Sequence, residues 1–363
     1  IMDGRVAVIG PGDKFISGIA YFTWRLSTAL DATPILFRDM LPKFLFPGKN
    51  RVGKVRSRIR YDNVAAYIDW WNVLSWYRAL KVCNQHEYTI IEWWTSSVAM
   101  VYAYIVTFTK SKVIIEMHET LDVMESKNWF LNWYGKIISS YIINRASAIV
   151  VHSHYDHDKI CSQISDNCSY KLNIIPHGLY DQYNKIPDAE PLTDFFDVLF
   201  FGLIRDYKGV KYLVEGFKKA NLPNSRLIVL GEMWDKIEFD DDPRILKILN
   251  YISDDTAEHY FSIADVVVLP YLRASSSGVA HIAMNYEIPI VSTLVGGLSD
   301  LVLYYNGMFY IDPADSDSIA HALRDIYYHY QGKKFPKPND LKWEAIKGKW
   351  KKLMFKIQWE SIE

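Results

Sequence analysis

The stretch Asp197-Val-Leu-Phe-Phe-Gly202-Leu-Ile-Arg205-Asp-Tyr-Lys208-Gly209 indicates the fold of this 363-residue chain. A short apolar run that ends in glycine and leads through a polar loop into a helical pattern is typical of a buried strand in a parallel sheet. Similar runs alternate with helical patterns over most of the sequence, which predicts an α/β fold. The other expected strands are residues 6–9, 89–92, 113–116, 148–152, 173–176, 226–231, 264–270, 289–292 and 308–311.

The length predicts two domains of roughly 150 residues or more each. One strand ending in glycine opens each half of the chain, and the polar stretch 180–195, which contains two prolines, indicates a linker between the halves. We therefore place the domains at 1–182 and 183–342. We expect 343–363 to form a helix that packs back on the first domain, with docking on the second as the alternative. Its predicted apolar face consists of Trp343, Ile346, Trp350, Leu353, Met354 and Ile357.

Composition excludes several classes of protein. About half of the residues are apolar, which excludes a disordered chain. The 41 Lys and Arg nearly balance the 42 Asp and Glu, so no nucleic acid is expected as a partner. The three cysteines are too few for a disulfide scaffold, and no apolar run reaches the ~18 residues of a membrane span. A strand begins at residue 5 with no leader pattern before it, so we expect a soluble, cytoplasmic protein.

Two other patterns suggest different chemistry. His152-Ser-His154-Tyr-Asp156-His157 has the H-x-H-x-D-H spacing of hydrolases that hold two metal ions, and its side chains suit Zn²⁺. However, about 150 residues of alternating α/β pattern precede it, and the same letters fit a strand end followed by a helix. Gly10-Pro-Gly12 begins a dinucleotide fingerprint, but Phe15 stands where its third glycine belongs, so no nicotinamide cofactor is indicated.

The loop after the strand 197–202 carries two cations, Arg205 and Lys208, between Gly202 and Gly209. Two cations at the carboxyl edge of a sheet suit a diphosphate and would stabilise negative charge on a departing nucleotide. Two solvated surface charges are the alternative interpretation, and the flanking glycines favour the first.

Two further loops have the composition of anion-binding helix starts. Ser275-Ser276-Ser277-Gly278-Val279 precedes a helical run that includes His281, so hydroxyls and free backbone N–H groups can meet a phosphate there. An ordinary serine N-cap is the alternative. Ser17 and Gly18 stand where the loop after the first strand enters a helix, which lets a ligand approach the backbone closely.

Taken together, these pieces resemble the family-4 nucleotide-sugar glycosyltransferases of the GT-B fold. The resemblance spans about residues 5–330. It rests on the Gly18 loop, F-G-x-I-R-x-Y-K-G from Phe201, A-S-x-S-G-V from Ala274, Pro176-His177-Gly178, and the P-I-V-S-T run before Gly296-Gly297-Leu298.

The resemblance implies two doubly wound Rossmann-like domains that face each other across a cleft, with the acceptor mainly on the first and the nucleotide sugar mainly on the second. It implies a retaining transferase of hexosyl type that needs no metal or cofactor, with UDP or GDP the expected carrier. Arg205 and Lys208 match the positions that neutralise the donor diphosphate. His118 matches a position that faces the donor sugar, Ile252 the segment that reads the base, and the backbone at Ser277 to Val279 the phosphate- and sugar-binding loop.

One departure concerns a pair of glutamates, E-x7-E, that many members carry in this loop. Ala274 and Ile282 occupy those positions, so both carboxylates are missing, as in a Ser-Gly variant of the motif. This leaves open which sugar is transferred and which group holds the ribose, for which His281 is a candidate. No carboxylate is placed as an obvious nucleophile, so the double displacement of retaining glycosidases is not indicated.

Residues 38–60 form a basic segment, with eight Lys or Arg, one acid, and the largely apolar stretch 41–46. Basic charge beside apolar groups suits an anionic membrane surface or a lipid-phosphate acceptor, at about 1 kcal/mol per cation near the surface. RNA binding and a solvated loop compete with this interpretation. The partners we expect are thus a nucleotide-sugar donor, a glycan or lipid-phosphate acceptor, and a peripheral contact with a membrane.

Three other functions remain open from the sequence. A nucleotide-sugar epimerase shares the fold, but its paired catalytic acids are not apparent. A metal-dependent hydrolase would use His152, His154, Asp156 and His157. A glycan- or nucleotide-binding protein without catalysis would explain the missing glutamates.

Overall fold

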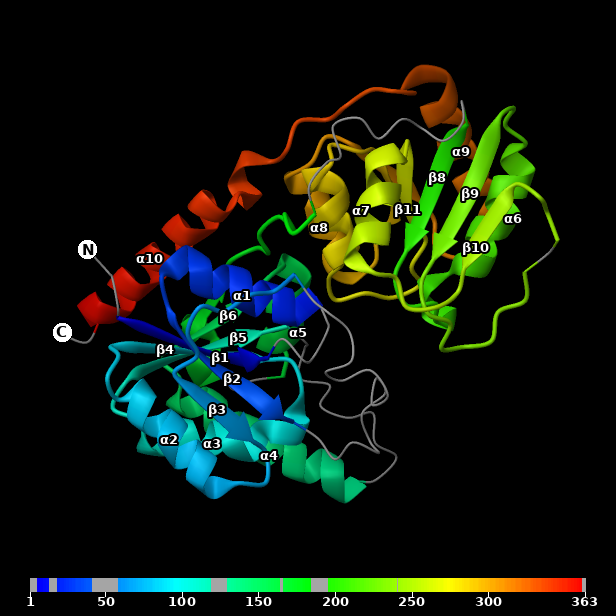
Figure 1. The fold of residues 1–363 in the computed structure, drawn as a ribbon. Helices are drawn as coiled ribbons and strands as arrows, with labels where there is room; N and C mark the ends of the chain where they lie inside the picture. Colours follow the sequence, from blue (N-terminus) through cyan, green and yellow to red (C-terminus); the bar gives the residue numbers. More distant parts are fainter. Residues whose placement is uncertain are drawn as a thin grey trace. The chain divides into compact units, whose positions relative to one another are not determined.

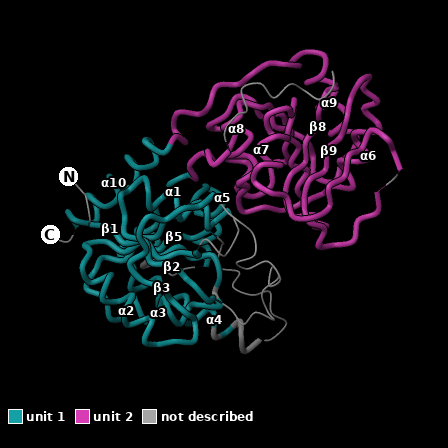
Figure 2. Tube along the Cα trace, in the orientation of Figure 1, with its two compact units in different colours: residues 1–176, 343–363 teal, residues 177–342 magenta. Residues whose placement is uncertain are grey.

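The computed structural model describes residues 5–12, 18–40, 58–118, 129–163, 166–183, 195–239 and 241–360. The chain divides into two compact units (Figure 2): residues 1–176 with 343–363, and residues 177–342. The sequence-based boundary at 182/183 therefore differs from the division at 176/177. In both units a parallel sheet is flanked by helices, so the α/β prediction is confirmed (Figure 1).

The first unit is built on a seven-stranded sheet with the order β3-β2-β1-β4-β5-β6-β7, in which all neighbouring strands run parallel. Its strands are β1 (Val6–Pro11), β2 (Thr33–Asp39), β3 (Ala66–Asp69), β4 (Tyr88–Trp93), β5 (Lys112–Met117), β6 (Ala148–Val151) and β7 (Leu172–Ile174). The strand order reverses between β1 and β4. In such sheets the ligand site lies at the carboxyl ends of the strands near this reversal.

Helices of the first unit cover both faces of the sheet. The structure assigns α1 (Gly18–Leu30), α2 (Val73–Cys83), α3 (Ala99–Phe108), α4 (Trp129–Arg145), α5 (His154–Cys161) and α10 (Trp343–Glu360). Figure 1 shows α2, α3 and α4 on one face and α1 and α10 on the other. Side chains alternate between the faces, because a strand repeats every two residues. Ile91 and Trp93 thus join the core under α2–α4, while Glu92 points to the α1 side, where it meets Thr23.

The helix α10 is the last element of the chain and belongs to the first unit. All six residues of its predicted apolar face are buried. The Tyr88 hydroxyl on β4 donates a hydrogen bond to the Met354 carbonyl at 2.9 Å, and the Trp343 ring lies 5.5 Å from that of Phe22 on α1. The core of the first unit is therefore built from two segments, one before and one after the second unit in the sequence.

The second unit has a six-stranded parallel sheet with the order β10-β9-β8-β11-β12-β13. Its strands are β8 (Phe196–Phe201), β9 (Ser225–Leu230), β10 (Ile245–Ile248), β11 (Val266–Leu269), β12 (Ile290–Thr293) and β13 (Met308–Ile311), and its helices are α6 (Val210–Ala220), α7 (Asp254–Ile263), α8 (Gly278–Asn285) and α9 (Ser316–His329). The order reverses between β8 and β11, so the loops that follow these two strands lie at the expected ligand edge.

Three strands, β2, β3 and β10, were not expected from the sequence. Pro34 interrupts the β2 run, but it is only the second residue of its strand. The other two have four residues each and lie at sheet edges. Within the described ranges, the model contains no helix whose length and apolar character would suit a membrane crossing.

Candidate active site at the edge of the second sheet

Two glycines hold the ends of β8 and β9 in close approach. Gly202 follows β8 with φ +128°, and Gly231 follows β9 with φ +155°. A Cβ on Gly231 would lie 1.7 Å from the Gly202 carbonyl oxygen, so no larger residue fits there. A Cβ on Gly202 would lie 3.9 Å from Val279 Cγ2, which places the start of α8 beside the end of β8. Two of the predicted donor-binding positions, far apart in the sequence, therefore meet.

Gly209 ties the loop after β8 to the loop after β11. Its φ of +69° is left-handed, and a Cβ there would lie 1.9 Å from the Pro270 carbonyl oxygen. The Leu272 N–H donates to the Tyr207 carbonyl at 2.8 Å across the same junction. Only glycine therefore fits at position 209, which flanks the predicted cations. The contact between the two loops also fixes the loop that carries Lys208.

The two predicted cations have different surroundings. Arg205 Nε donates to Asp235 Oδ2 at 3.0 Å, and the Asp206 N–H donates to the same oxygen at 2.9 Å. These bonds lower the pKa of Asp235, so it stays charged and holds Arg205. Lys208 makes no ion pair with any carboxylate of the described chain, and its amine lies over two aromatic rings instead. Lys208 is therefore the cation that is available to a ligand.

Tyr271, directly after Pro270, was not singled out by the sequence analysis. Its ring is fully buried, its face lies 3.6 Å from Lys208 Nζ, and its hydroxyl lies 3.5 Å from Ser277 Oγ. Tyr271 thus lies between the candidate cation and the start of α8. An aromatic residue at the carboxyl end of a strand next to the sheet reversal was the available signal.

The start of α8 leaves its N–H groups available. Ser277 is the N-cap, yet its side chain makes no capping hydrogen bond to the first turn. Gly278 is required because a Cβ there would lie 2.6 Å from the Tyr180 ring. Uncapped N–H groups at a helix start favour an anion.

The other residues of this unit that the sequence predicted for the site differ in their exposure to solvent. Ser275 and Ser276 are partly exposed in the loop before α8, and Ile252 is partly exposed in the loop between β10 and α7. His281 is buried on α8, with its ring 6.0 Å from that of Tyr180 and 5.8 Å from that of His177. It packs inside the unit.

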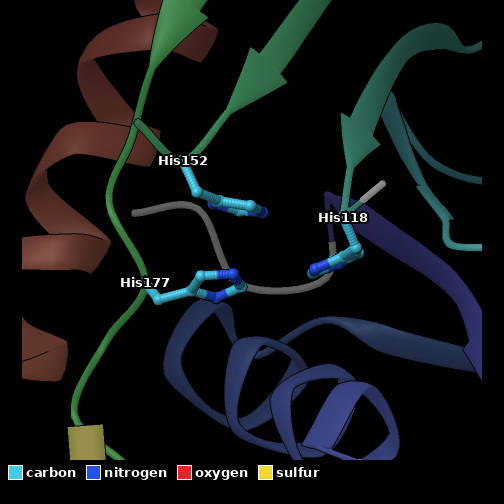
Figure 3. A group of neighbouring side chains, drawn as sticks. All are labelled: His118, His152 and His177. Atoms are coloured by element: carbon cyan, nitrogen blue, oxygen red, sulfur yellow. The ribbon is translucent and has the colours of Figure 1, made fainter. Parts of the chain in front are cut away.

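In the first unit, His118 and His152 follow β5 and β6 (Figure 3). Both are buried, their rings lie 4.9 Å apart, and the Phe22 ring of α1 packs edge-on against each of them. His177, drawn in the same figure, is the first residue of the second unit and is described with that unit.

Below these histidines lie two carboxyl groups that the sequence analysis took only as strand ends. Glu92 and Glu116 are register partners on β4 and β5, and both are fully buried. Burial raises the pKa of Glu92 to about 8 and that of Glu116 well above its ordinary value, and it lowers the pKa of His118 to about 3. Without a bound cation the acids are therefore neutral at pH 7, and so is the imidazole.

The H-x-H-x-D-H pattern does not form a metal centre in the described chain. Ser153 caps α5 by accepting from the Asp156 N–H at 3.0 Å, and its hydroxyl donates to Asp156 Oδ2 at 2.6 Å. His154 is exposed on the first turn, and His157 lies next to Asp158. None of His154, Asp156 and His157 joins a group of ligand atoms close enough for a metal. The pattern is the end of β6 followed by a capped helix.

Part of the predicted acceptor side falls outside the described residues. Gly18 is the first residue of α1, but Ser17 and residues 41–57 of the basic segment are not described. At one end of the segment, Arg38 forms a two-bond ion pair with the buried Asp69. One of its eight cations is therefore committed to the fold of the first unit.

Residues 196–329, from the first residue of β8 to the last of α9, match the family described as Glycosyl transferases group 1. The match covers most of the second unit. An uncharacterized glycosyltransferase of Methanocaldococcus jannaschii is 30% identical over 130 residues, 34% of this chain and 33% of that protein.

Two further proteins extend the comparison. A GDP-mannose:glycolipid 4-beta-D-mannosyltransferase of Xanthomonas campestris is 30% identical over 102 residues, 26% of this chain and 29% of that protein. These matches span about a third of each relative's length. The HepE protein of Anabaena, solved in complex with UDP, superposes with a TM-score of 0.66 at 14% identity, covering 98% of both chains. That likeness supports the GT-B fold of the whole chain.

Proposed function

We propose that this protein is a retaining glycosyltransferase that moves a hexosyl group from a UDP- or GDP-sugar to a glycan or lipid-phosphate acceptor. One observation carries the proposal. The amine of Lys208 has no carboxylate partner among the described residues and lies at the reversal of the second sheet, on the ring whose hydroxyl approaches Ser277. A free cation beside an uncapped helix start is a site for a diphosphate.

The chemistry follows from where charge develops. When the bond from the sugar to the diphosphate breaks, negative charge grows on the departing phosphate. Lys208 and the backbone N–H groups at Gly278 and Val279 stabilise that charge, and Gly202 allows the phosphates to approach the backbone. Arg205 takes a secondary part, because Asp235 already holds its Nε. These groups do the work that a metal ion does in other transferases, so transfer itself needs no metal.

Front-face substitution fits the first unit better than double displacement. A glycosyl-enzyme intermediate needs an ionised carboxylate at the sugar, but the acids nearest His118, Glu92 and Glu116, are fully buried. In the proposed reaction the departing diphosphate accepts the acceptor's proton. His118 keeps the role implied by the family resemblance, contact with the donor sugar.

The acceptor side is proposed on sequence grounds. Ser17, Gly18 and the segment 38–60 are assigned to it, with the basic segment at an anionic membrane surface. A relative acts on a glycolipid and uses GDP-mannose, while a structural neighbour holds UDP. Both carriers are therefore tested.

The first test is a thermal-shift panel with UDP, GDP, ADP and their sugar conjugates. EDTA is present or absent in every arm, including the ligand-free reference. Ligand at ~100 times its Kd adds about 2.7 kcal/mol of stability. We expect UDP or GDP compounds to raise the Tm by a few degrees, with the same increment with and without EDTA. No response to any nucleotide, or a response that EDTA abolishes, contradicts the proposal.

A further inference from the structure

The outer surface of three helices in the first unit has an unusual composition. The helices α2, α3 and α4 cover one face of the first sheet (Figure 1). Their sequences, VLSWYRALKVC, AMVYAYIVTF and WFLNWYGKIISSYIINR, contain four Lys or Arg and no Asp or Glu. In the whole chain, by contrast, 42 acidic residues slightly outnumber 41 basic ones. This surface therefore differs in charge from the rest of the protein.

The three helices lie side by side, with α3 in the middle. The Trp76 ring of α2 lies 5.7 Å from the Tyr104 ring of α3. On the other side of α3, the hydroxyl oxygens of Thr107 and of Tyr141 on α4 lie 2.8 Å apart, which is hydrogen-bond distance. The outer sides of the three helices therefore form one continuous surface.

Each of the three helices exposes large apolar side chains on this surface. Leu74 on α2 is 68% exposed, Phe108 on α3 is 59% exposed, and Ile137 on α4 is 50% exposed. The middle helix α3 has no charged residue at all, although the outer face of a surface helix ordinarily carries charges. Single exposed apolar residues are common, but a continuous apolar patch marks a site of contact with a protein or a membrane.

The cations stand on both sides of this uncharged centre. Lys81 Nζ lies 4.7 Å from the centre of the Tyr77 ring, and the Arg145 guanidinium lies 5.0 Å from that of Tyr141. Tyrosine, lysine and arginine have apolar bodies and polar tips, so they suit the boundary between lipid and water. All four cations are exposed, and none forms an ion pair with a carboxylate of the described residues: Arg78, Lys81, Lys136 and Arg145.

We propose that the outer surface of α2, α3 and α4 binds a lipid bilayer that contains anionic headgroups. A bilayer presents an apolar interior beneath a layer of phosphates, and this surface matches both with an apolar centre and flanking cations. A nucleic acid would need cations where its phosphates lie, so the uncharged α3 fits it poorly. A protein partner fits less well too, because protein interfaces are depleted in lysine.

This surface is separate from the basic segment 38–60, to which the proposed function assigns a membrane contact. None of the three helices contains a residue of that segment, and the binding does not depend on the transfer reaction. The opposite face of the same sheet is covered by α1 and α10 (Figure 1). There α10 exposes Phe355 and Trp359 together with Lys351 and Lys352. Because a flat bilayer touches one face at a time, α10 supplies matched controls.

The test is sedimentation of the full chain with vesicles of phosphatidylcholine, alone or mixed with phosphatidylglycerol, at low salt. We expect binding to the mixed vesicles that exceeds binding to phosphatidylcholine alone. Leu74→Gln/Phe108→Gln/Ile137→Gln should lower the partition coefficient at least about tenfold, because three apolar side chains no longer leave water. Arg78→Gln/Lys136→Gln should lower it about fivefold for each cation removed.

The controls remove the same kinds of side chain from α10. Phe355→Gln/Trp359→Gln and Lys351→Gln/Lys352→Gln should bind the mixed vesicles as well as the parent protein does. Circular dichroism and thermal unfolding check that every variant is folded, and the Arg78/Lys136 variant decides should the triple variant misfold.

Three results overturn the proposal. The first is a parent protein that does not bind the mixed vesicles. The second is undiminished binding by the folded triple variant, which assigns the contact to another surface such as the basic segment. Gel filtration of both proteins then shows whether the surface joins two copies of the chain instead. The third is an equal loss of binding in the α10 variants. The thermal-shift response to nucleotides is independent of all three.

Discussion

The amine of Lys208 lies 3.6 Å from the centre of the Tyr271 ring, although the two residues belong to different loops. An ammonium ion over an aromatic face gains about 0.5–2 kcal/mol, more when water is excluded. Because Tyr271 is fully buried, its ring is held in place and positions the flexible side chain of Lys208. The ring thereby holds the charge at the sheet edge without neutralising it, as a carboxylate would.

Replacing Lys208 by alanine should lower turnover about 100-fold or more, a typical loss for a key electrostatic donor. The matched control is Lys211→Ala, which removes an exposed lysine on α6. Steady-state rates with the nucleotide sugar found in the thermal-shift panel measure both. Near-normal turnover of a folded Lys208→Ala protein would remove Lys208 from the active site.

Tyr271→Leu should lower kcat/KM about tenfold, because Lys208 loses the aromatic face that positions it. Tyr271→Phe keeps the face and removes only the hydroxyl near Ser277, so most of the activity should remain. Circular dichroism checks that the leucine variant folds. Equal losses in the two variants would shift the role of Tyr271 from its ring to its hydroxyl.

Gly209→Ala should destabilise the second unit by about 2 kcal/mol or more, since a left-handed φ alone costs an alanine about 1–2 kcal/mol. The added clash with the Pro270 carbonyl raises that cost. Gly348→Ala is the contrasting variant. It lies in α10 with no atom within 4 Å of the added Cβ, and should stabilise the protein by about 0.5–1 kcal/mol. Thermal unfolding compares them; a Tm for Gly209→Ala at or above that of the parent refutes the steric argument.

Asp265→Asn should stabilise the protein above pH 6 and have little effect below pH 4. Burial raises the pKa of Asp265 to about 6, against 3.8 for an ordinary aspartate. Between these values the folded state holds a proton that the unfolded state has released, so stability falls as the pH rises. The total is at most roughly 3 kcal/mol, because each pH unit between the two pKa values contributes about 1.4 kcal/mol.

An asparagine oxygen at that position can still accept the Asp197 N–H, which Asp265 Oδ2 accepts at 2.8 Å. Unfolding measured at pH 4, 6 and 8 gives the stability difference directly. Asp312→Asn, at an exposed position of the same unit, should give a flat difference over this range. A flat profile for Asp265→Asn too would show that its carboxyl group is solvated.

The sequence predicted the central strands and the ligand edge because both have local signals. Buried parallel strands are nearly continuous apolar runs, as in 197–201, and glycine follows where backbones approach. Edge strands lack such runs. A proline near the start of β2 interrupts its apolar run, so this strand was not predicted. The order of strands, and so the meeting of Gly202 with Val279, depends on pairing between distant segments.

The sites were predicted less completely. Which charged side chains are available in a site depends on partners that lie far away in the sequence. Arg205 and Lys208 look equivalent as letters, yet Asp235, 30 residues downstream, pairs with only one of them. Glu92 and Glu116 each close an expected strand, and only the parallel register of β4 and β5 brings them together. A glutamate at the same place in two successive strands, the second followed by His118, was the signal that could have shown the cluster.

Because α10 completes the core of the first unit, the first unit begins before the second unit during synthesis but is completed after it. The whole second unit, residues 177–342, leaves the ribosome before the helix that the first unit still lacks. In the folded structure its two ends are joined by the hydrogen bond from the Leu179 N–H to the Leu341 carbonyl, at 2.9 Å. We therefore expect the second unit to fold during translation. The first unit can complete its core only after α10 is synthesised, because the Tyr88 hydroxyl on β4 has its acceptor, the Met354 carbonyl, on that helix.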